Sequence, residues 1–374
     1  MHNALPEKTL LETAGRWWMP DGFIDAICHH DTVVQAIDRQ QQPESCPIFL
    51  PAPIDLHVHG GGGHDCMDGD EAIRGMLLTH AQHGTGALLA TSVTAPFADI
   101  SEFIASARRV MQSPDSQAAT LLGVHLEGPF ISPDKLGAQP PYPAAIDLNQ
   151  LEDWFDSGVV RVVTYAPELD PDGKLIELCD RYKVRAQLGH TLCSWAEACQ
   201  ALQSGCGVTH LFNAMSGFSH RDGGAVTAAL AYAEYAEIIL DGLHVEKAAF
   251  DAARRAIPRL YSVSDGTAAS GMPDGDYTLG RLQVRKEAGQ VLLPDGTLAG
   301  SCLTQLKIIA LLRDWGIDWH TVGAMLSAIP AQWVALESLG QISVGATAHW
   351  LEIVDDEPAA LWLSGQRYSL SGSE

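Results

Sequence analysis

The sequence is poor in positive charge. It contains 23 lysine and arginine residues against 46 aspartate and glutamate residues, which gives a formal net charge of −23 at pH 7. Its longest basic clusters are pairs, such as Arg108-Arg109 and Arg254-Arg255. Nucleic-acid backbones and anionic membrane surfaces are themselves negative, so this charge balance excludes a general binder of either. We therefore expect no nucleic-acid partner and no membrane partner.

Apolar runs of membrane length and cysteine pairs are missing as well. No stretch approaches the roughly 18 uninterrupted apolar residues that a membrane span requires, and the first residues hold no apolar core of export-signal length. The eight cysteines show no C-x-x-C spacing. We therefore expect a cytoplasmic protein with reduced thiols.

The motifs of three common enzyme classes are also absent. The chain contains no G-x-S-x-G nucleophile elbow, no Walker loop and no dinucleotide fingerprint, and the glycine run at 60–63 lacks the neighbouring lysine of a phosphate loop. Histidine, with 15 copies, is the residue that remains to be explained. Metal binding and acid–base chemistry both draw on it.

From residue 51 onward, apolar runs typical of strands alternate with segments of helical spacing. We expect strands at 54–59, 87–94, 121–128, 159–167, 184–190, 208–214, 238–245 and 260–265. We expect helices between them at 70–83, 98–111, 148–156, 171–182, 194–203, 224–233 and 246–256. This alternation predicts parallel pairing, and eight such units close a barrel. The predicted fold class is α/β, a (β/α)8 TIM-like barrel in preference to an open doubly wound sheet.

The two ends of the chain have a different pattern. Short apolar runs broken by polar clusters predict strands in the first fifty residues and again after residue 340. We therefore expect a small β-sandwich domain formed from both termini, residues 1–50 plus 341–374, beside a catalytic barrel at 51–340. Within the barrel segment, residues 281–293 read as one or two strands and residues 301–339 as a helical tract.

Several predicted strands end in a side chain that can bind a metal or a proton: His59, Glu127, His190, His210 and Asp265. The carboxyl ends of the strands of a parallel barrel face one mouth, where catalytic residues collect. We therefore expect these sequence-distant side chains to converge.

Two subsets of these residues have the spacing of metal ligands. His57 and His59 lie two apart on one strand, so both imidazoles point to the same side. Glu127, at the end of an apolar run, needs a cation or hydrogen-bond donors if it is buried. With His190 and His210 it forms a three-ligand set that leaves a position open for water, although each histidine alone could be an interior hydrogen-bonded residue.

Asp265 has three open roles, as a metal ligand, a general base or a turn residue, of which the turn is least favoured. A metal lowers the pKa of bound water to about 7, and a nearby carboxylate can take its proton as it attacks a carbonyl. The pattern therefore predicts hydrolytic chemistry.

With these residues assembled, the chain resembles the amidohydrolase superfamily, and within it the N-acetylglucosamine-6-phosphate deacetylase family. The motifs that carry the resemblance are PAPIDLHVHG at 51–60, HLEGPF at 125–130, LGHT at 188–191, THLFNAM at 209–215, DGLHV at 241–245, DGTA at 265–268, GMPDGDY at 271–277 and LAGS at 298–301. They span nearly the whole length, and the block at 209–215 is the most specific.

The resemblance implies metal-dependent hydrolysis of the N-acetyl group of N-acetyl-D-glucosamine 6-phosphate, which gives glucosamine 6-phosphate and acetate. It assigns the main divalent metal to Glu127, His190 and His210 and the general base to Asp265. The residues that it places around the substrate are Ala138, Gln139, Asn213, Ala214, Arg221, His244, Leu298, Ala299 and Gly300. The guanidinium of Arg221 can pair two phosphate oxygens.

The resemblance also implies a cofactor and an assembly. The metal is expected to be Zn²⁺, with Fe²⁺ as the alternative. Some members lack the first-strand H-x-H, whereas this chain keeps His57 and His59, so a second metal bridged by Glu127 is expected. The family further implies a homodimer, and the ligand is a small-molecule amino-sugar phosphate.

One position departs from the family pattern. Where the family usually has a histidine that polarises the substrate carbonyl, this chain has Gln139. A glutamine donates a neutral hydrogen bond and carries no proton. A related compound is therefore an alternative substrate, either N-acetylgalactosamine 6-phosphate or another N-acyl compound. A cyclic amidase, a deaminase and a non-catalytic sugar-phosphate sensor are the remaining alternatives.

Overall fold

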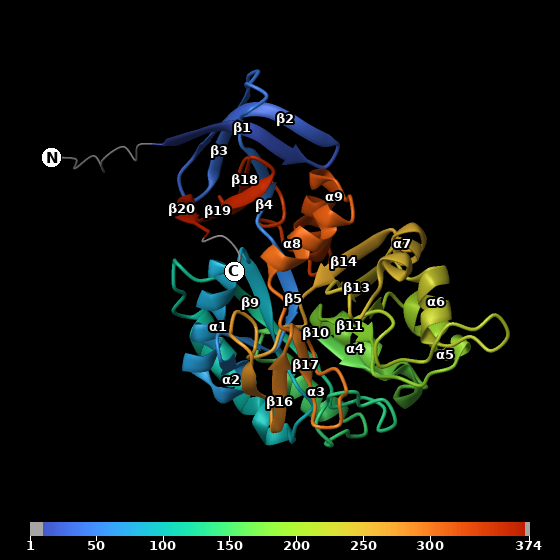
Figure 1. Ribbon diagram of the computed structural model, residues 1–374. Coiled ribbons are helices and arrows are strands. Elements are labelled where there is room, and N and C mark those ends of the chain that lie inside the picture. Colours follow the sequence, from blue (N-terminus) through green and yellow to red (C-terminus); the bar gives the residue numbers. More distant parts are fainter. Residues whose placement is uncertain (1–9, 371–374) are drawn as a thin grey trace.

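The computed structural model describes residues 10–370, and a parallel barrel forms its centre (Figure 1). Eight strands pair in the order β14-β13-β12-β11-β10-β9-β8-β5. A parallel bridge between Val58 and Gly266 joins the two ends of this series. The strands are β5 (Ile54–Val58), β8 (Ala87–Ser92), β9 (Thr120–Glu127), β10 (Val160–Tyr165), β11 (Arg185–Leu188), β12 (Gly207–Val208), β13 (Tyr235–Ile239) and β14 (Arg259–Val263). The predicted barrel is confirmed.

The sixth strand differs most from its predicted range. β12 has two residues where the sequence predicts a strand over 208–214. The backbone takes positive φ at His210 (29°), Phe212 (83°) and Ala214 (48°). An extended strand requires negative φ, so the chain leaves the sheet after Val208 and turns across the barrel mouth.

The seven predicted helices all form, within about three residues of their predicted bounds. They are α1 (Asp70–Gln82), α2 (Phe97–Met111), α3 (Leu148–Phe155), α4 (Lys174–Tyr182), α5 (Trp195–Gln203), α6 (Ala225–Tyr232) and α7 (Lys247–Ala256). The start of α5 has a capping box, in which the Ser194 hydroxyl accepts from the Glu197 amide while the Glu197 carboxylate accepts from the Ser194 amide. The helices cover the outside of the barrel, so its strands are buried on both faces (Figure 1).

Strands from both ends of the chain form a second sheet, called here the terminal sheet. Its order is β20-β19-β18-β4-β1-β2-β3, built from β1 (Leu11–Met19), β2 (Gly22–His30), β3 (Val34–Arg39), β4 (Ile48–Pro51), β18 (Trp350–Val354), β19 (Glu357–Leu363) and β20 (Gln366–Ser369). The sheet folds back on itself, because His30 of β2 lies 5.6 Å from Trp362 of β19, between ring centroids. Residues 1–9 and 371–374 of the predicted terminal domain lie outside the described residues, and its exact bounds stay a prediction.

Between the barrel and the terminal sheet, the chain adds a hairpin region and a helical tract. Three antiparallel strands follow β14 where one or two were expected, namely β15 (Gly275–Leu279), β16 (Leu282–Glu287) and β17 (Gln290–Leu292). The helical tract contains α8 (Gln305–Asp314), α9 (Trp319–Gly323), a π-helical turn (Ala324–Ala328) and α10 (Ile329–Trp333). Among residues 10–370, no helix combines the length and apolarity needed to cross a membrane.

Candidate metal centre

Glu127, His190 and His210 meet at the carboxyl ends of three barrel strands, β9, β11 and β12. Glu127 is the last residue of β9, and each histidine follows the end of β11 or β12 by two residues. Glu127 Oε1 lies 3.1 Å from His190 Nε2 and 2.9 Å from His210 Nε2. The two Nε2 atoms are 3.1 Å apart, and all three residues are buried. The strand ends thus bring the predicted three-ligand set together.

Backbone conformation contributes to this convergence. His190 (φ 46°), His210 (φ 29°) and Asp265 (φ 50°) all take the left-handed conformation just after their strands. Non-glycine residues rarely adopt it, and such residues cluster at functional sites. The turn at each position directs the side chain across the barrel mouth.

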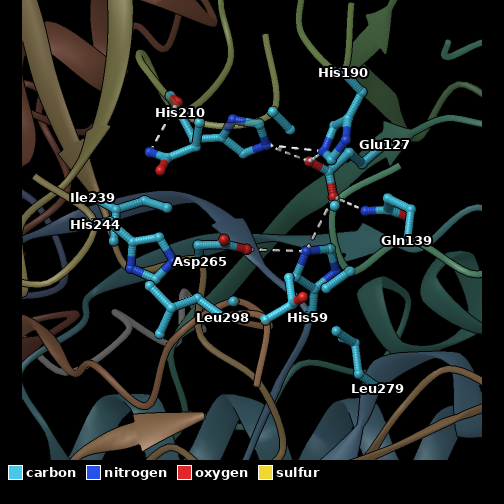
Figure 2. A pocket seen from close by; sticks show the side chains of 16 residues that line it. His59, Glu127, Gln139, His190, His210, Ile239, His244, Asp265, Leu279 and Leu298 are labelled. Carbon is cyan, nitrogen blue, oxygen red and sulfur yellow. Dashed lines mark hydrogen bonds and ion pairs between the residues drawn. The ribbon is translucent and has the colours of Figure 1, made fainter. Parts of the chain in front are cut away.

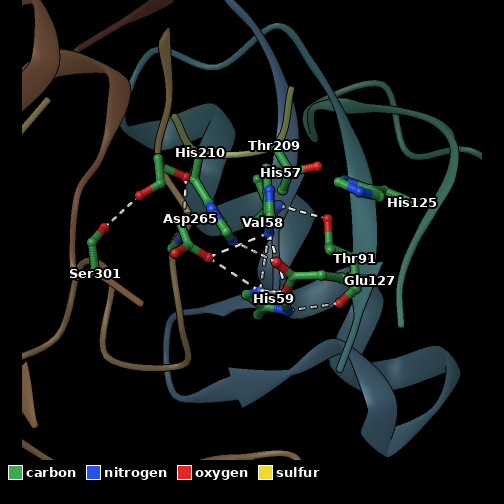
Figure 3. A network of polar contacts seen from close by, with 12 residues as sticks. His57, Val58, His59, Thr91, His125, Glu127, Thr209, His210, Asp265 and Ser301 are labelled. Atoms are coloured by element: carbon green, nitrogen blue, oxygen red, sulfur yellow. Dashed lines mark hydrogen bonds and ion pairs between the residues drawn. The ribbon is translucent and has the colours of Figure 1, made fainter. Parts of the chain in front are cut away.

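His57, His59 and Asp265 form the neighbouring cluster (Figure 3). The Nε2 atoms of the two histidines are 3.2 Å apart, and Asp265 Oδ1 lies 3.4 Å from the first and 3.1 Å from the second. The second oxygen of Glu127, Oε2, lies 3.5 Å from His57 Nε2 and 3.2 Å from His59 Nε2. Glu127 therefore faces both clusters, one with each oxygen.

The donor atoms of both clusters fit a divalent cation. His190 Nδ1 lies 2.9 Å from Lys135 O and His59 Nδ1 lies 3.0 Å from Thr91 O, so each ring donates its Nδ1 proton to a carbonyl. Each neutral ring then points the lone pair of Nε2 at another imidazole and at a carboxylate oxygen. Such buried lone pairs repel one another unless a proton or a metal ion lies between them.

The electrostatics of the site agree with this fit. Burial raises the pKa of Glu127, but the charges of His57 and His190 outweigh it and hold that pKa well below its usual range. Burial lowers the pKa of His59, but hydrogen bonds to Asp265 and Glu127 raise it to about 9. Burial likewise raises the pKa of Asp265, but His57 and His59 bring it below its ordinary value. Carboxylates therefore stay ionised here and attract cations.

A cavity of about 250 Å³ opens above the two clusters (Figure 2). Its wall includes the candidate metal ligands His59, Glu127, His190 and His210 together with Asp265. Of the substrate residues expected from the sequence, Ala138, Gln139, Asn213, Ala214, His244, Leu298 and Gly300 also line it. His57 is fully buried and does not line the cavity, and Ala299 is buried between two lining residues without forming part of the wall.

Comparison with known proteins places this site in a family. Residues 48–362 match the model of the Amidohydrolase family. The chain belongs to the amidohydrolase family. It is 32% identical over 368 residues to an N-acetylglucosamine-6-phosphate deacetylase of Vibrio furnissii, covering 94% of this chain and 92% of that one. It is 31% identical to an N-acetylgalactosamine-6-phosphate deacetylase of Escherichia coli O157:H7, covering 98% and 99%.

Solved structures give the same assignment. A mutant N-acetyl-D-glucosamine-6-phosphate deacetylase from Mycobacterium smegmatis, in complex with N-acetyl-D-glucosamine-6-phosphate, superimposes with a TM-score of 0.88 at 26% identity, covering 96% of this chain and 99% of that one. The Pasteurella multocida N-acetylglucosamine-6-phosphate deacetylase has a TM-score of 0.89 at 24% identity, which supports the fold. The chain is thus a hydrolase of a metal-dependent family, in agreement with the clusters at its barrel mouth.

Gln139 lies on the cavity wall of this amidohydrolase and bonds both the backbone and the shared carboxylate. Its Oε1 accepts the Thr94 amide at 2.6 Å, which fixes Nε2 as the amide nitrogen. That Nε2 donates to Glu127 Oε2. Gln139 therefore orients the carboxylate that the two clusters share, and it does so from the cavity wall.

His244 is held at the opposite wall of the cavity. Its Nδ1 lies 2.6 Å from Asp241 Oδ2, and its backbone amide bonds the other oxygen of the same carboxylate at 2.7 Å. Burial lowers the pKa of His244, but the bond to Asp241 outweighs it and raises that pKa above its ordinary value. A protonated imidazole at this wall suits an anionic ligand.

Arg221 lies elsewhere. It is exposed on the loop between β12 and α6, and it is not among the residues that line the cavity. Conversely, the wall contains Ile239, Leu279 and Thr297, which the sequence did not single out. Apolar and hydroxyl side chains carry no distinctive chemical signal in a sequence. The predicted strand at 238–245 pointed only to Ile239, and no predicted strand contained Leu279 or Thr297.

Proposed function

We propose that this amidohydrolase hydrolyses the N-acetyl group of N-acetyl-D-glucosamine 6-phosphate, giving glucosamine 6-phosphate and acetate. The observation that carries the proposal is the placement of Asp265 opposite Glu127, His190 and His210 at the floor of one cavity. An amide hydrolase needs a metal-ligand set and a carboxylate base on the two sides of the reacting carbonyl. The similarity of this chain to N-acetylglucosamine-6-phosphate deacetylases supports this sugar phosphate as the substrate.

Zn²⁺ is the metal that we propose, held by Glu127, His190 and His210, with Fe²⁺ as the alternative. Imidazole and carboxylate ligands suit both ions. A second ion at His57 and His59 would share Glu127, whose two oxygens face the two clusters. When bound, such a metal supplies an acidified water and polarises the amide carbonyl.

Asp265 is the proton carrier of the proposed reaction. Its carboxylate accepts the proton of the attacking water and later delivers it to the departing amine, so the residue ends the cycle ionised. The bonds of its backbone hold it in place, because its amide donates to His57 O at 3.0 Å and its carbonyl accepts the Ser301 amide at 2.8 Å. Backbone bonds to β5 on one side and to the segment at Ser301 on the other thus fix the base relative to the histidines.

The remaining wall of the cavity is proposed to hold the sugar phosphate. His244 offers a cationic ring, while Asn213, Ala214 and Leu298 to Gly300 surround it. The −23 net charge repels an anionic substrate, so capture depends on these local groups and on the metal. Because salt screens the unfavourable overall field, we expect added salt to weaken binding little.

A homodimer would explain the position of Arg221. Several large apolar side chains are exposed on or beside its loop, namely Leu192, Trp195, Phe218 and Tyr232. The ring centroids of Trp195 and Tyr232 lie 6.3 Å apart, and the Trp195 backbone amide donates to Gly223 O. The apolar patch and the loop that carries Arg221 are therefore contiguous. We propose that the patch packs against a second copy, which brings Arg221 of one subunit to the phosphate held by the other.

The galacto epimer is the second candidate substrate. Identity to the N-acetylgalactosamine-6-phosphate deacetylase, 31%, is nearly the same as to the glucosamine enzyme, 32%, so overall similarity does not choose between them. The two sugars differ only at C4.

An amine-release assay with four substrates tests these proposals. The set is N-acetylglucosamine and N-acetylgalactosamine, each with and without the 6-phosphate, given to the zinc-loaded protein. We expect turnover of the 6-phosphates, with N-acetylglucosamine 6-phosphate preferred in kcat/KM. Equal rates with and without phosphate would contradict the phosphate-binding wall, a preference for the galacto epimer would select the second candidate, and no turnover of any of the four would contradict both.

A further inference from the structure

Glu237 is a carboxylate buried inside the barrel, below the two metal clusters. It lies on β13, and its side chain has no exposed surface. Glu237 Oε2 lies 3.1 Å from His57 Nδ1 and 3.4 Å from the backbone nitrogen of His210. Glu237 Oε1 lies 2.9 Å from Gln187 Nε2 and 3.3 Å from the Tyr261 hydroxyl. An interior carboxylate requires such donors, since an unpaired buried charge is costly.

The partners of Glu237 can be assigned as donors from their own surroundings. Gln187 Oε1 accepts the Trp333 indole N–H at 2.7 Å, and an indole nitrogen can only donate. The other terminal atom of Gln187 is therefore its NH₂ group, which donates to Glu237. The His210 backbone nitrogen is a donor as well. The Tyr261 hydroxyl gives its single hydrogen to Gln187 Oε1, at 2.9 Å, rather than to Glu237 at 3.3 Å. The Gln187 amide and the His210 backbone nitrogen still donate one hydrogen bond to each carboxylate oxygen, which keeps Glu237 ionised and accepting.

This assignment fixes the tautomer of His57. An ionised carboxylate has no hydrogen to give, so His57 Nδ1 must carry the proton of the contact with Glu237. A neutral His57 then has its lone pair on Nε2, the atom that faces His59, Glu127 and Asp265. Metal-ligating histidines commonly receive such support from a carboxylate at the other ring nitrogen.

A separate metal site below the mouth does not account for the same residues. His57, His125 and Glu237 approach one another closely enough to hold an ion. However, His125 Nδ1 donates to Leu56 O at 3.1 Å, and its Nε2 bonds the Thr164 hydroxyl at 2.7 Å. Both ring nitrogens of His125 are occupied, and its ring packs edge-on against His57 at 4.7 Å (Figure 3).

We propose that Glu237 is the positioning residue for the H-x-H half of the metal centre. It holds His57 in the Nδ1–H tautomer, and through the His210 amide it ties this half to the Glu127, His190 and His210 half. The inference rests on the metal site of the proposed function, but on neither the sugar nor the acyl group. His59 has a different support, the Thr91 carbonyl, so it serves as an internal reference.

Glu237→Gln in the full chain tests the proposal, because the amide matches the carboxylate in shape but directs hydrogens at groups that are themselves donors. The first readout is the ¹⁵N NMR signature of the His57 ring, assigned with His57→Ala, in the zinc-loaded protein. We expect Nδ1–H with a bound Nε2 in the wild type, loss of this pattern in Glu237→Gln, and an unchanged His59. The second readout is zinc affinity, measured by chelator competition. We expect the affinity for the more weakly bound zinc ion to fall by about 10- to 100-fold in Glu237→Gln.

Tyr261→Phe is the matched control. It removes a hydroxyl that donates to Gln187 Oε1 at 2.9 Å and lies 3.3 Å from the same carboxylate, but it leaves the contact between Glu237 and His57 untouched. We expect this variant to retain both the NMR signature of His57 and the wild-type affinity for the more weakly bound zinc ion. Should Glu237→Gln lower only the melting temperature while zinc affinity and the His57 tautomer stay as in the wild type, Glu237 is a packing residue and the proposal is wrong. A wild type whose His57 binds no zinc overturns it as well.

The proposed function can fail independently. A wild type that binds zinc through His57 but releases no amine from any amino-sugar phosphate contradicts the substrate and leaves the role of Glu237 in place. If a Glu237→Gln protein with unchanged zinc affinity turns over the sugar phosphate, the substrate is supported and the role proposed for Glu237 is contradicted.

Discussion

Two clusters of stacked and crossed rings lie buried in this molecule, one at the barrel mouth and one in the terminal sheet. At the mouth, the His57 and His59 rings cross at 5.1 Å and are surrounded by the carboxylates of Glu127 and Asp265. In the terminal sheet, Trp17 stacks on Phe49 at 4.2 Å and other aromatic rings surround them. The same degree of burial therefore encloses charge in one region and hydrocarbon in the other.

This difference in chemistry predicts that the barrel mouth contributes mainly to activity and the terminal sheet mainly to stability. Buried ions gain little net stability over apolar groups of similar size, because desolvation offsets their attraction. Buried aromatic rings contribute directly, through apolar area and ring contacts. We therefore expect changes at the mouth to remove activity far more than stability, and changes in the terminal sheet to do the reverse.

The largest effect should follow from Glu127→Gln. This change removes the one carboxylate that faces both histidine pairs, so both metal positions should empty. Loss of the metal removes several kcal/mol of transition-state stabilisation, roughly a 10⁴-fold fall in kcat/KM. Metal analysis of the purified protein and the amine-release assay measure the two effects. A variant that keeps its zinc and its rate would show that Glu127 is not the shared ligand.

Asp265→Asn should separate proton transfer from metal binding. We expect kcat to fall by about 10²- to 10⁴-fold, because the asparagine cannot accept the proton of the attacking water. Zinc at Glu127, His190 and His210 should remain, since none of these contacts involves Asp265. Activity and zinc content measured on the same sample decide the matter, and an unchanged kcat would remove Asp265 from the role of base.

Sequence alone predicts much of the mouth, because strand ends of a parallel barrel converge by topology. Glu127, His190 and His210 needed only that rule and their side-chain types. Glu237 escaped because the seventh strand was predicted to begin at residue 238, whereas β13 begins at Tyr235. A glutamate just before an apolar run reads as a solvated strand end, and its buried partners come from β5, β11 and β14, far away in the sequence.

Other parts of the site depended on loop geometry that periodicity does not encode. The turn after β12 shortens the predicted strand. The loop after β17 folds back against that strand and places Thr297 and Leu298 at the cavity. Arg221 was predicted from resemblance alone, and in the single chain it lies outside the cavity. Its role, and the second subunit that would bring it to a cavity, remain part of the proposed function.

In the terminal sheet, Phe49→Ala should cost stability and spare activity. Phe49 is 1% exposed and packs against Trp17 on one side and Trp350 on another. Truncation of such a ring lowers the free energy of unfolding by about 3–5 kcal/mol. Urea unfolding measures the loss, while kcat below the unfolding transition should match the wild type. A fall in kcat with unchanged stability would break the contrast between the two regions.

The smallest effect should come from Trp350→Phe, although Trp350 is among the largest buried side chains. Its indole N–H has no hydrogen-bond partner within residues 10–370. The smaller ring loses apolar contact, but it also removes a buried unpaired donor whose burial costs about 1–3 kcal/mol. The two terms oppose each other, so the free energy of unfolding should change by no more than about 1 kcal/mol. A loss above about 3 kcal/mol in urea unfolding would mean that a buried water bonds this N–H, and that the terminal sheet, like the mouth, depends on a polar contact.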